Sequence, residues 1–295
     1  MKNVSIVIVS YNTKQDLSNC LGSIYKHTKN VDFEVIVVDN NSHDGSTTMI
    51  TKKFPQVKLI KSGKNIGFGR ANNLGASKAK GKYLLFLNPD TILSSNLIKQ
   101  SYQIAERTDR LGAFSIRLLF ADKTIQPSGG YFPNLIRLFS WHTAIDELPI
   151  INKLIKPIHP PVNFYQKTFE QDWITGAFMF TPKKVFTDLK GFDENIFMYG
   201  EDLELCYRLK KNGFKIVYFS SPSITHLQSK SSSSKFAILS EIKGVKYFFK
   251  KHKPPWQQPL VNLIFKLGSL LRLLLFGIIL GDVSKKEIYQ EALKY

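Results

Sequence analysis

The chain has 295 residues, 43% of them hydrophobic and 22% charged, which excludes a disordered protein and is enough for one large α/β domain with an extension. Its only two cysteines, Cys20 and Cys206, exclude a disulfide framework and a cysteine metal cage. The excess of 41 Lys and Arg over 23 Asp and Glu gives a net charge of +18, which requires an anionic partner such as a phosphorylated substrate, anionic lipid or nucleic acid.

The first part of the chain alternates apolar runs with segments of helical spacing. Short β-branched or aromatic runs predict strands, and apolar residues three or four positions apart predict helices. Strands are expected at residues 4–9, 33–38, 57–60 and 83–87, and helices at 16–27, 46–54, 65–80 and 97–107. This order is typical of a parallel sheet with crossover helices, so we expect an α/β fold.

The second part of the chain is less regular. Strands are expected at residues 112–119 and 215–219, an apolar ordered run at 173–182, and a helix at 202–211 that Gly213 ends. Residues 126–131 are a turn-rich loop, and residues 133–169 show no clear period, which favours a substrate loop. The serine-rich tract 229–235 predicts a mobile loop or a domain boundary.

The C-terminal segment predicts association with a membrane. Residues 260–280 are apolar and almost long enough to span a bilayer, but Lys266 and Arg272 interrupt them. An interfacial helix is the first interpretation, and a core or oligomer helix and a true span are the alternatives. The basic run at residues 246–253, with aromatics between its charges, suits anionic headgroups. Because no signal peptide precedes the first strand, we expect a cytoplasmic protein, peripheral on the inner face of the membrane.

The triplet Asn88-Pro89-Asp90 follows the predicted strand at residues 83–87. Proline cannot donate to a sheet ladder, so the strand should stop at Asn88 and leave Asp90 at its carboxyl end. Ligands of open α/β sheets bind just outside these ends, where a carboxylate can hold a divalent cation and the cation a phosphate. The alternative is a plain turn in which Asp90 caps the next helix.

Polar residues also end the first two predicted strands. Ser10, Tyr11 and Asn12 follow the first, and their backbone can frame a base edge, while Asp39 follows the second and can accept a hydrogen bond from a pyrimidine imino group. Asp44 is interpreted as a turn residue and helix N-cap. A Gly-x-Gly-x-x-Gly fingerprint does not follow the first strand, which argues against a nicotinamide-dependent oxidoreductase.

Six motifs in order together resemble the family 2 inverting glycosyltransferases, and most closely the bacterial rhamnosyltransferase type, over roughly residues 4–226. The motifs are Ser-Tyr-Asn12, Val-Val-Asp-Asn-Asn-Ser-x-Asp-Gly-Ser46, Asn65-Ile-Gly-Phe-Gly-Arg-Ala-Asn72, Asn-Pro-Asp90, Asp-Trp173 with Gly-Ala177, and Gly-Phe-Asp-Glu194 before Tyr-Gly-Glu-Asp202.

This resemblance implies a GT-A fold, Rossmann-like with a mostly parallel sheet flanked by helices. It also implies a nucleotide-diphosphate sugar donor, such as dTDP-rhamnose or a UDP-sugar, a divalent metal (Mn²⁺ or Mg²⁺) and a lipid-linked or cell-surface glycan acceptor. We expect residues 1–228 to form the transferase domain, with a nucleotide-binding half to about residue 115 and an acceptor half over residues 116–228. Residues 229–295 would form a basic, amphipathic helical extension.

The resemblance also assigns roles to residues. It implies a donor-binding set of Ser10, Tyr11, Asn12, Asp39, Asn41, Asn65, Arg70, Asn72 and Asn88. Asp90 matches the last aspartate of the family's Asp-x-Asp metal motif, and His226 resembles a histidine that closes the metal site in some members. Asn88 departs from the first aspartate of that motif. A structural role is the alternative for His226.

The acidic pair Glu201-Asp202 resembles the one that supplies the base in this family. An inverting transfer needs a carboxylate on the face opposite the leaving diphosphate, and we assign this role to Asp202 with Glu201 as its helper. Capping of the next helix is the alternative. Asp172, Trp173 and Gly176 are assigned to the acceptor or sugar, with Trp173 as a stacking platform near Asp172. A buried core position is the alternative for Trp173.

Two hypotheses for function remain. The first is a metal-dependent inverting glycosyltransferase at the membrane surface, with no nucleic-acid partner. The second is a catalytically silent nucleotide-sugar or nucleic-acid binding protein on the same fold, which the Asn88 departure favours.

Overall fold

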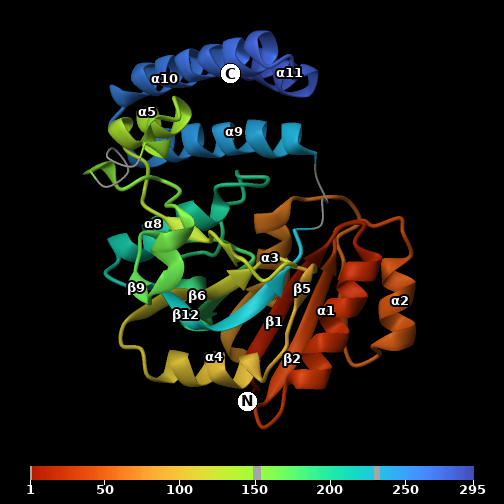
Figure 1. The fold of residues 1–295 in the computed structure, drawn as a ribbon. Coiled ribbons are helices and arrows are strands. Elements are labelled where there is room, and N and C mark those ends of the chain that lie inside the picture. Colours follow the sequence, from red (N-terminus) through yellow and green to blue (C-terminus); the bar gives the residue numbers. More distant parts are fainter. Residues whose placement is uncertain (1, 149–153, 229–232) are drawn as a thin grey trace. The chain divides into compact units, whose positions relative to one another are not determined.

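The structure is a computed structural model that describes residues 2–148, 154–228 and 233–295. The chain forms two compact units (Figure 1). The first comprises Met1–Gly129, Pro161–Phe197 and Glu201–Ser231, and the second comprises Gly130–Pro160, Met198–Gly200 and Ser232–Tyr295. The second unit therefore takes in residues from the irregular middle of the chain in addition to the predicted C-terminal extension.

A central sheet of ten described strands forms the first unit, and its main path runs β3-β2-β1-β4-β11-β6-β12-β5. Its strands are β1 (Lys2–Ser10), β2 (Phe33–Asp39), β3 (Lys58–Lys61), β4 (Gly81–Leu87), β5 (Thr91–Ile92), β6 (Leu111–Leu119), β7 (Ile125–Gln126), β9 (Phe169–Glu170), β11 (Phe178–Pro182) and β12 (Lys215–His226). Two further short strands are β8 (Gly129–Gly130) and β10 (Trp173–Ile174).

The helices of the first unit cross between these strands. They are α1 (Lys14–His27), α2 (Ser46–Lys53), α3 (Phe68–Ser77), α4 (Leu97–Glu106), η2 (Val162–Gln166), α7 (Lys183–Asp188) and α8 (Glu201–Lys211). Figure 1 shows α1 and α2 beside the β1–β2 part of the sheet. The alternation predicted from the apolar periodicity is confirmed, with boundaries that move by one to a few residues.

The N-terminal half of the sheet is parallel. Strands β3, β2, β1 and β4 run in one direction, and β1 pairs with β2 in a register that sets Ser10 opposite Asp39. Alternate residues of β1 and β2, among them Ile6 and Val35, are buried in the main apolar core. Leu17 and Leu21 of α1 pack in the same core. Consequently the polar residues after β1, β2 and β4 all lie at the carboxyl edge of the sheet, as predicted.

Strand β11 interrupts the parallel order, because it runs antiparallel to both β4 and β6. The sequence indicated an ordered apolar run here but carried no information about its direction. The reversal brings the start of β11 to the end of β4, where the Asn88 amide donates to the Ala177 carbonyl at 3.0 Å. The sheet is therefore mixed, and a reversed strand borders its ligand edge.

Strand β12 is longer than predicted, because it continues from Lys215 to His226 past Phe219. A register shift between Phe219 and Ser223 lets the strand pass Pro222 and resume its parallel pairing with β6. Beyond this bulge β12 pairs antiparallel with β5, and His226 lies opposite Thr91. The prediction ended the strand at residue 219 because serines and a proline follow it, which are typical of a turn.

The second unit is helical. Its elements are α5 (Leu135–His142), η1 (Ile145–Glu147), α9 (Ser234–His252), α10 (Gln257–Arg272), the π-helix η3 (Leu273–Ile279) and α11 (Val283–Ala292). The predicted apolar helix at residues 260–280 is confirmed as α10 and η3. The Ser233 hydroxyl caps α9 by accepting from the Phe236 amide, whereas most of the serine-rich tract, residues 229–232, lies outside the described residues.

His142 is the buried polar centre of this unit. Burial, with the Arg272 charge nearby, lowers its pKa from 6.5 to about 4. The unfolded chain therefore binds a proton at His142 below about pH 6.5, whereas the folded unit does not until about pH 4. Stability that is present at neutral pH must decline as the pH falls between these values.

We expect this linkage to cost about 3 kcal/mol of unfolding free energy between neutral pH and pH 4. Urea unfolding followed by the fluorescence of Trp141 and Trp256 at a series of pH values measures it. His142→Gln, which cannot titrate, should flatten the decline relative to the wild type. Parallel pH dependences of the two proteins would contradict the assignment.

Candidate functional site

The loops that follow β1 and β2 are tied together by hydrogen bonds. The Asn12 amide donates to the Ser42 hydroxyl at 3.0 Å, and the Asn12 side chain accepts from the His43 amide at 2.8 Å. Asn12 has a positive φ of 53°, a conformation that asparagine tolerates better than most residues. Ser10 is buried, its carbonyl accepts from the Asn40 amide, and Tyr11 beside it is 38% exposed. The two strand ends thus form one braced platform.

Asp39 is buried at the floor of this platform, with 3% of its surface exposed. One carboxylate oxygen, Oδ2, accepts from the Ser42 amide at 3.2 Å. Among the described residues the other oxygen, Oδ1, is buried and has no hydrogen-bond partner. A buried acceptor without a donor costs free energy, so this oxygen fits a ligand that brings an N–H group.

Asp44 is a turn residue as predicted, but it is not the N-cap of α2, which is Gly45. Its carboxylate accepts from the Lys14 amide at 2.7 Å at the start of α1 and from the Ser46 amide at 2.9 Å. Partial burial raises its pKa, but the hydrogen bonds from Ser46 and Lys14 outweigh burial and lower the pKa overall.

The loop between β3 and α3 is braced by Asn40, a residue the sequence analysis did not select. Its side chain donates to Asn65 Oδ1 at 2.8 Å and accepts from the Ile66 amide at 3.0 Å. The predicted Asn41 instead has a positive φ of 71° and contacts His43. Gly67 is required here, because a Cβ atom would lie 2.4 Å from the Phe197 carbonyl oxygen.

The polar residues of α3 have different surroundings. Arg70 is half exposed, and its Nε donates to the Glu194 carbonyl at 2.7 Å. Asn72 is buried and donates to the Phe68 carbonyl of its own helix, which leaves it turned inward. Asn73, which was not predicted, donates to the Phe192 carbonyl at 2.9 Å and accepts from its amide. Arg70 is therefore the exposed cation of this helix, and Asn73 holds the Gly-Phe-Asp-Glu loop.

Asp90, Asn88 and His226 form one cluster at the end of β4. The His226 Nε2 atom lies 3.2 Å from Asp90 Oδ1 and 3.2 Å from Asn88 Nδ2, and its Nδ1 atom lies 3.0 Å from Gln126 Oε1. Asp90 does not cap a helix, because β5 follows it and α4 begins only at Leu97. Below the turn, Thr91 donates to the Asn88 carbonyl, and the buried Cys20, whose thiol pKa burial raises to about 12, packs against Thr91.

The hydrogen bonds of this cluster decide which nitrogen of His226 faces Asp90 and Asn88. A Gln126 carbonyl oxygen can only accept, so His226 Nδ1 carries the proton and Nε2 of a neutral ring has a lone pair. That lone pair lies 3.2 Å from the Asn88 amide nitrogen, which can donate to it, and 3.2 Å from Asp90 Oδ1, so a metal ion on His226 and Asp90 would replace the hydrogen bond from Asn88. Two ligand atoms at adjacent octahedral positions around Mg²⁺ are about 3 Å apart, so the spacing fits a metal.

Among the residues that the structure describes, no group of three or more His, Cys, Asp or Glu could hold a metal. Asp90 and His226 are thus a group of two such residues.

Asp202 lies at the first turn of α8, one residue after the buried Glu201. Its Oδ2 atom accepts from the Gly176 amide at 3.1 Å and its Oδ1 atom from the Leu203 amide at 2.8 Å. Ala177, next to Gly176, accepts from the Asn88 amide. The segment 176–177 thus connects the Asp202 carboxylate to the Asp90 cluster through hydrogen bonds.

Asp172 and Trp173 are engaged within the first unit. Asp172 accepts from Lys210 Nζ at 2.8 Å, an ion pair that joins the residue before β10 to α8. Trp173 is only 8% exposed, which favours the core interpretation over a sugar platform.

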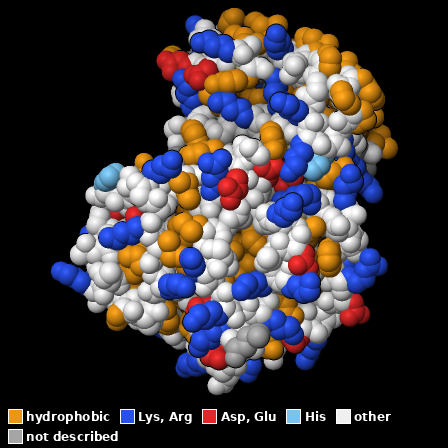
Figure 2. Space-filling view, turned by 180° about the vertical axis from the view of Figure 1, so that it is seen from behind, with side chains coloured by type: hydrophobic (Ala, Val, Ile, Leu, Met, Phe, Trp, Pro, Cys, Tyr) orange, Lys and Arg blue, Asp and Glu red, His pale blue; other side chains and the backbone are white. Residues whose placement is uncertain are grey.

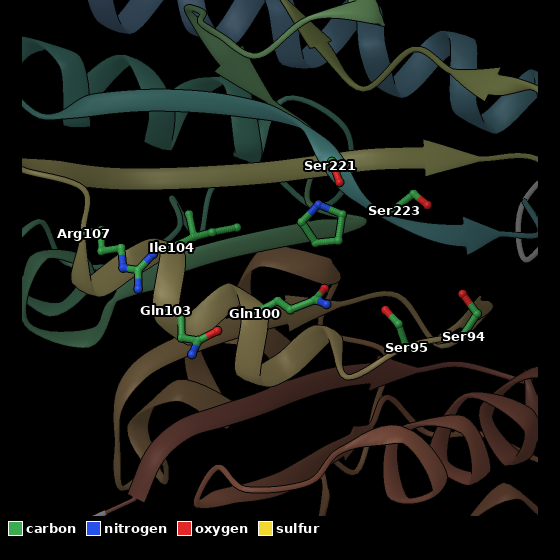
Figure 3. Close-up of a pocket in the computed structure, with 9 residues that line it drawn as sticks. Ser94, Ser95, Gln100, Gln103, Ile104, Arg107, Ser221 and Ser223 are labelled. Atoms are coloured by element: carbon green, nitrogen blue, oxygen red, sulfur yellow. The ribbon is translucent and has the colours of Figure 1, made fainter.

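A cavity of about 550 Å³ lies elsewhere in the first unit, between α4 and the bulge of β12 (Figure 3). Figure 3 shows Gln100 and Gln103 of α4 and Arg107, which follows that helix, on one side and Ser221 and Ser223 of β12 on the other. None of the predicted site residues lines it.

Residues 5–164 match the family model of glycosyl transferase family 2. The chain is 27% identical over 281 residues to the N-acetylglucosaminyl-diphospho-decaprenol L-rhamnosyltransferase of Mycobacterium tuberculosis, covering 86% of this chain and 87% of that protein. It is 30% identical over 228 residues to rhamnosyltransferase WbbL of Escherichia coli K12, covering 73% and 80%.

Two solved structures share the fold. One is GalNAc-T7 with UDP, GalNAc and Mn²⁺, with a TM-score of 0.63 and 16% identity over 99% of this chain and 54% of that chain. The other is the mannosyltransferase PcManGT of Pyrobaculum calidifontis with GDP-Man and Mn²⁺, with a TM-score of 0.57 and 13% identity over 99% and 74%. At these identities the likeness shows the fold alone.

Proposed function

Because this chain belongs to glycosyl transferase family 2, we propose that it moves a sugar, L-rhamnose or another hexose, from a nucleotide-diphosphate donor to a lipid-linked or cell-surface glycan acceptor, with inversion at the anomeric carbon. The names of two relatives support this acceptor and sugar class, since one is a rhamnosyltransferase of a diphospho-decaprenol substrate. The observation that carries the proposal is the hydrogen-bonded connection from Asn88 through segment 176–177 to Asp202.

The donor nucleotide would bind at the braced ends of β1 and β2. The buried Oδ1 atom of Asp39 would accept the imino proton of uracil or thymine, which supports a UDP- or dTDP-sugar. Tyr11 is exposed enough to stack on the base, and Ser10, Asn12, Asn41 and Asn65 belong to the surrounding loops. Arg70 is the half-exposed cation of α3 and would exchange its contacts with Glu194 for the diphosphate. Asn72 is buried and would act only by holding α3 in place.

A divalent cation, Mn²⁺ or Mg²⁺, would be held by Asp90 and His226, with Asn88 beside them. The donor set fits this, because Gln126 fixes the proton on His226 Nδ1 and turns the Nε2 lone pair toward Asp90. When bound, such a cation would neutralise charge on the donor diphosphate. Both solved structures described above contain Mn²⁺.

Asp202 would be the general base, and Glu201 would position it. The acceptor hydroxyl oxygen forms a bond to the anomeric carbon as the bond to the diphosphate oxygen breaks, and the hydroxyl proton passes to the Asp202 carboxylate. The amides of Gly176 and Leu203 hold that carboxylate in one orientation, so that the base is fixed before the acceptor binds.

The enzyme would work in the cytoplasm on the inner face of the cell membrane. Its net charge of +18 suits an anionic donor, an acceptor with a diphosphate and anionic lipid. The second hypothesis, a catalytically silent nucleotide-sugar or nucleic-acid binding protein, gains no support from the comparisons, which favour glycosyl transfer.

We expect the full chain to release nucleoside diphosphate from one member of a panel of dTDP- and UDP-sugars in the presence of Mn²⁺ or Mg²⁺ and a polyprenyl-diphosphate glycan. Nuclear magnetic resonance of the product should show an anomeric configuration opposite to that of the donor. Retention of configuration would contradict the role of Asp202. Nucleotide binding by calorimetry without turnover of any donor would restore the silent alternative.

A further inference from the structure

The helix formed by α10 and η3 presents an apolar stripe to solvent. We define the stripe by six leucines of the helix face, each between 41% and 52% exposed: Leu260, Leu263, Leu267, Leu270, Leu271 and Leu274. Except for the adjacent Leu270 and Leu271, successive members are three or four residues apart, and at about 100° per residue all six fall on one side of the helix. Figure 2 shows hydrophobic side chains gathered over the C-terminal helices, with Lys and Arg at the border of the patch.

The opposite side of the helix is anchored within the second unit. Val261, Phe265 and Ser269 are buried, and His142 Nε2 lies 3.2 Å from the Phe265 carbonyl. Arg272 donates to the Trp141 and His142 carbonyls at 2.9 and 3.0 Å. One face of the helix therefore packs against the protein. The other face has no protein partner among the described residues of its unit.

The two cations that interrupt the apolar segment avoid the stripe. At about 100° per residue, Arg272 lies about 150° from the centre of the stripe and Lys266 about 90° from it. Arg272 thus faces the protein, and Lys266 lies at the border, where a long side chain can reach lipid headgroups. Neither cation would have to enter hydrocarbon if the stripe did.

From these observations we infer that α10 and η3 lie in the plane of one leaflet of an anionic phospholipid membrane, with the apolar stripe in the acyl boundary and Lys266 among the headgroups. The helix has 23 residues, about 35 Å, so its length alone would permit a span. A span would, however, expose the anchored face and Arg272 to lipid, at the loss of the hydrogen bonds that Arg272 makes.

The chain reverses at the end of this helix, which also favours an in-plane position. Gly281 has a positive φ of 64°, and α11 returns with Ile288 and Tyr289 buried in the same unit. Tyr289 stacks on Phe276 of η3 with ring centroids 6.0 Å apart. Ile278 and Val283 lie on either side of the reversal and are 68% and 69% exposed. The reversal is thus itself apolar at its tip, and α11 remains packed on the protein.

The chemistry of the surface favours lipid over a second protein. Binding energy at protein interfaces concentrates in Trp, Tyr and Arg, whereas this stripe is entirely aliphatic. Residues 233–295 contain 11 Lys and Arg against 4 Asp and Glu, a balance that attracts anionic headgroups. The inference rests on the proposed function, because the enzyme would bind a lipid-linked acceptor at the membrane surface.

Fluorescent labels on the full chain test the depth of the helix. The native Cys20 and Cys206 are both buried, so a polarity-sensitive dye can be attached to Leu263→Cys, Leu271→Cys or Leu274→Cys, with Asn262→Cys as an exposed control outside the stripe. With vesicles of phosphatidylcholine and phosphatidylglycerol, the three stripe labels should shift to the blue, and nitroxides near the headgroups should quench them equally. Unequal depths of Leu263 and Leu274 would indicate a span and overturn the inference. A blue shift without vesicles, together with a doubled mass, would indicate a dimer and overturn it as well.

Vesicle flotation with two serine variants gives a second measurement. The double variant Leu267→Ser, Leu271→Ser should partition at least about ten-fold more weakly than the wild type, since two buried leucines are lost from the lipid. Val162→Ser, which makes the same kind of change at an exposed residue of the first unit, should partition like the wild type. Equal partitioning of all three proteins would contradict the inference.

Nucleotide binding and sugar transfer, measured on the same proteins, separate the two proposals. Transfer to a detergent-dispersed acceptor without binding to vesicles would overturn the membrane surface and leave the proposed function intact. Binding to vesicles without turnover of any donor would do the reverse.

Discussion

Replacing Asp202 with asparagine is expected to lower kcat for sugar transfer by about 10²- to 10⁴-fold, because an amide cannot accept the proton of the acceptor hydroxyl. The change preserves size and shape, and an asparagine oxygen can still accept from the Gly176 amide that holds Asp202 at 3.1 Å. Folding and donor binding should therefore stay close to those of the wild type. Initial rates of product formation at saturating donor and acceptor measure the effect.

Two further variants separate the base from its surroundings. Glu201→Gln should reduce kcat less than Asp202→Asn, because Glu201 is buried and would act only by positioning Asp202. Asp188→Asn removes an exposed carboxylate of α7 and should leave kcat unchanged. If Asp202→Asn kept the kcat of the wild type, the base would have to be another residue and the role of Asp202 would reduce to capping α8.

The sheet edge could be predicted because it depends on local patterns. Buried parallel strands appear as apolar runs, and the polar residue that ends each run marks the carboxyl edge. This pattern predicted that Ser10, Asp39 and Asp90 lie at one edge of the sheet, although the sequence did not show which strands pair with each other. The spacing of apolar residues similarly identified α1 and α8.

The supporting residues could not be predicted, because long-range pairing decides their positions. Gln126 contacts His226 across 100 positions of sequence, and nothing in the neighbourhood of Gln126 in the chain marks it. Asn40 was passed over for Asn41, since both are asparagines after the same strand and only the course of the loop decides which one turns inward. The link from Asn88 to Ala177 uses backbone groups, which no residue pattern encodes.

In the C-terminal helix, too, the local pattern predicted the element, whereas long-range contacts decide its surroundings. Its existence and length followed from hydropathy, but the sequence left three interpretations open because it shows Lys266 and Arg272 without their directions. Only 17% of its most apolar window is buried, whereas a core helix would be mostly buried. The anchoring of Arg272 to the carbonyls of Trp141 and His142 then distinguishes a helix with one protein face from a helix surrounded by lipid.

Loss of either proposed metal ligand is expected to have the second large effect. Asp90→Ala removes the only carboxylate of the cluster, so the affinity for Mn²⁺ in the presence of UDP or dTDP should fall by about 100-fold or more, and His226→Ala should act in the same direction. Gln126→Ala removes the side chain whose carbonyl oxygen lies 3.0 Å from His226 Nδ1 and orients the ring. Because Gln126 would not itself contact the metal, the affinity for Mn²⁺ should fall by about 10- to 100-fold. Paramagnetic resonance of free Mn²⁺ measures these affinities without requiring turnover.

The order of these effects is what tests the arrangement. A metal held by Asp90 and His226 predicts that Gln126→Ala weakens binding less than either ligand variant, and that Asp32→Asn, which removes an exposed carboxylate paired with Lys2 at the opposite end of β1, has no effect. Asn88→Asp adds a carboxylate next to the pair and should tighten Mn²⁺ binding, because affinity for hard cations rises with ligand charge. If Asp90→Ala and His226→Ala both bound Mn²⁺ like the wild type, the 3.2 Å pair would be a protonated His226 on Asp90, a structural ion pair that closes β12 against β5.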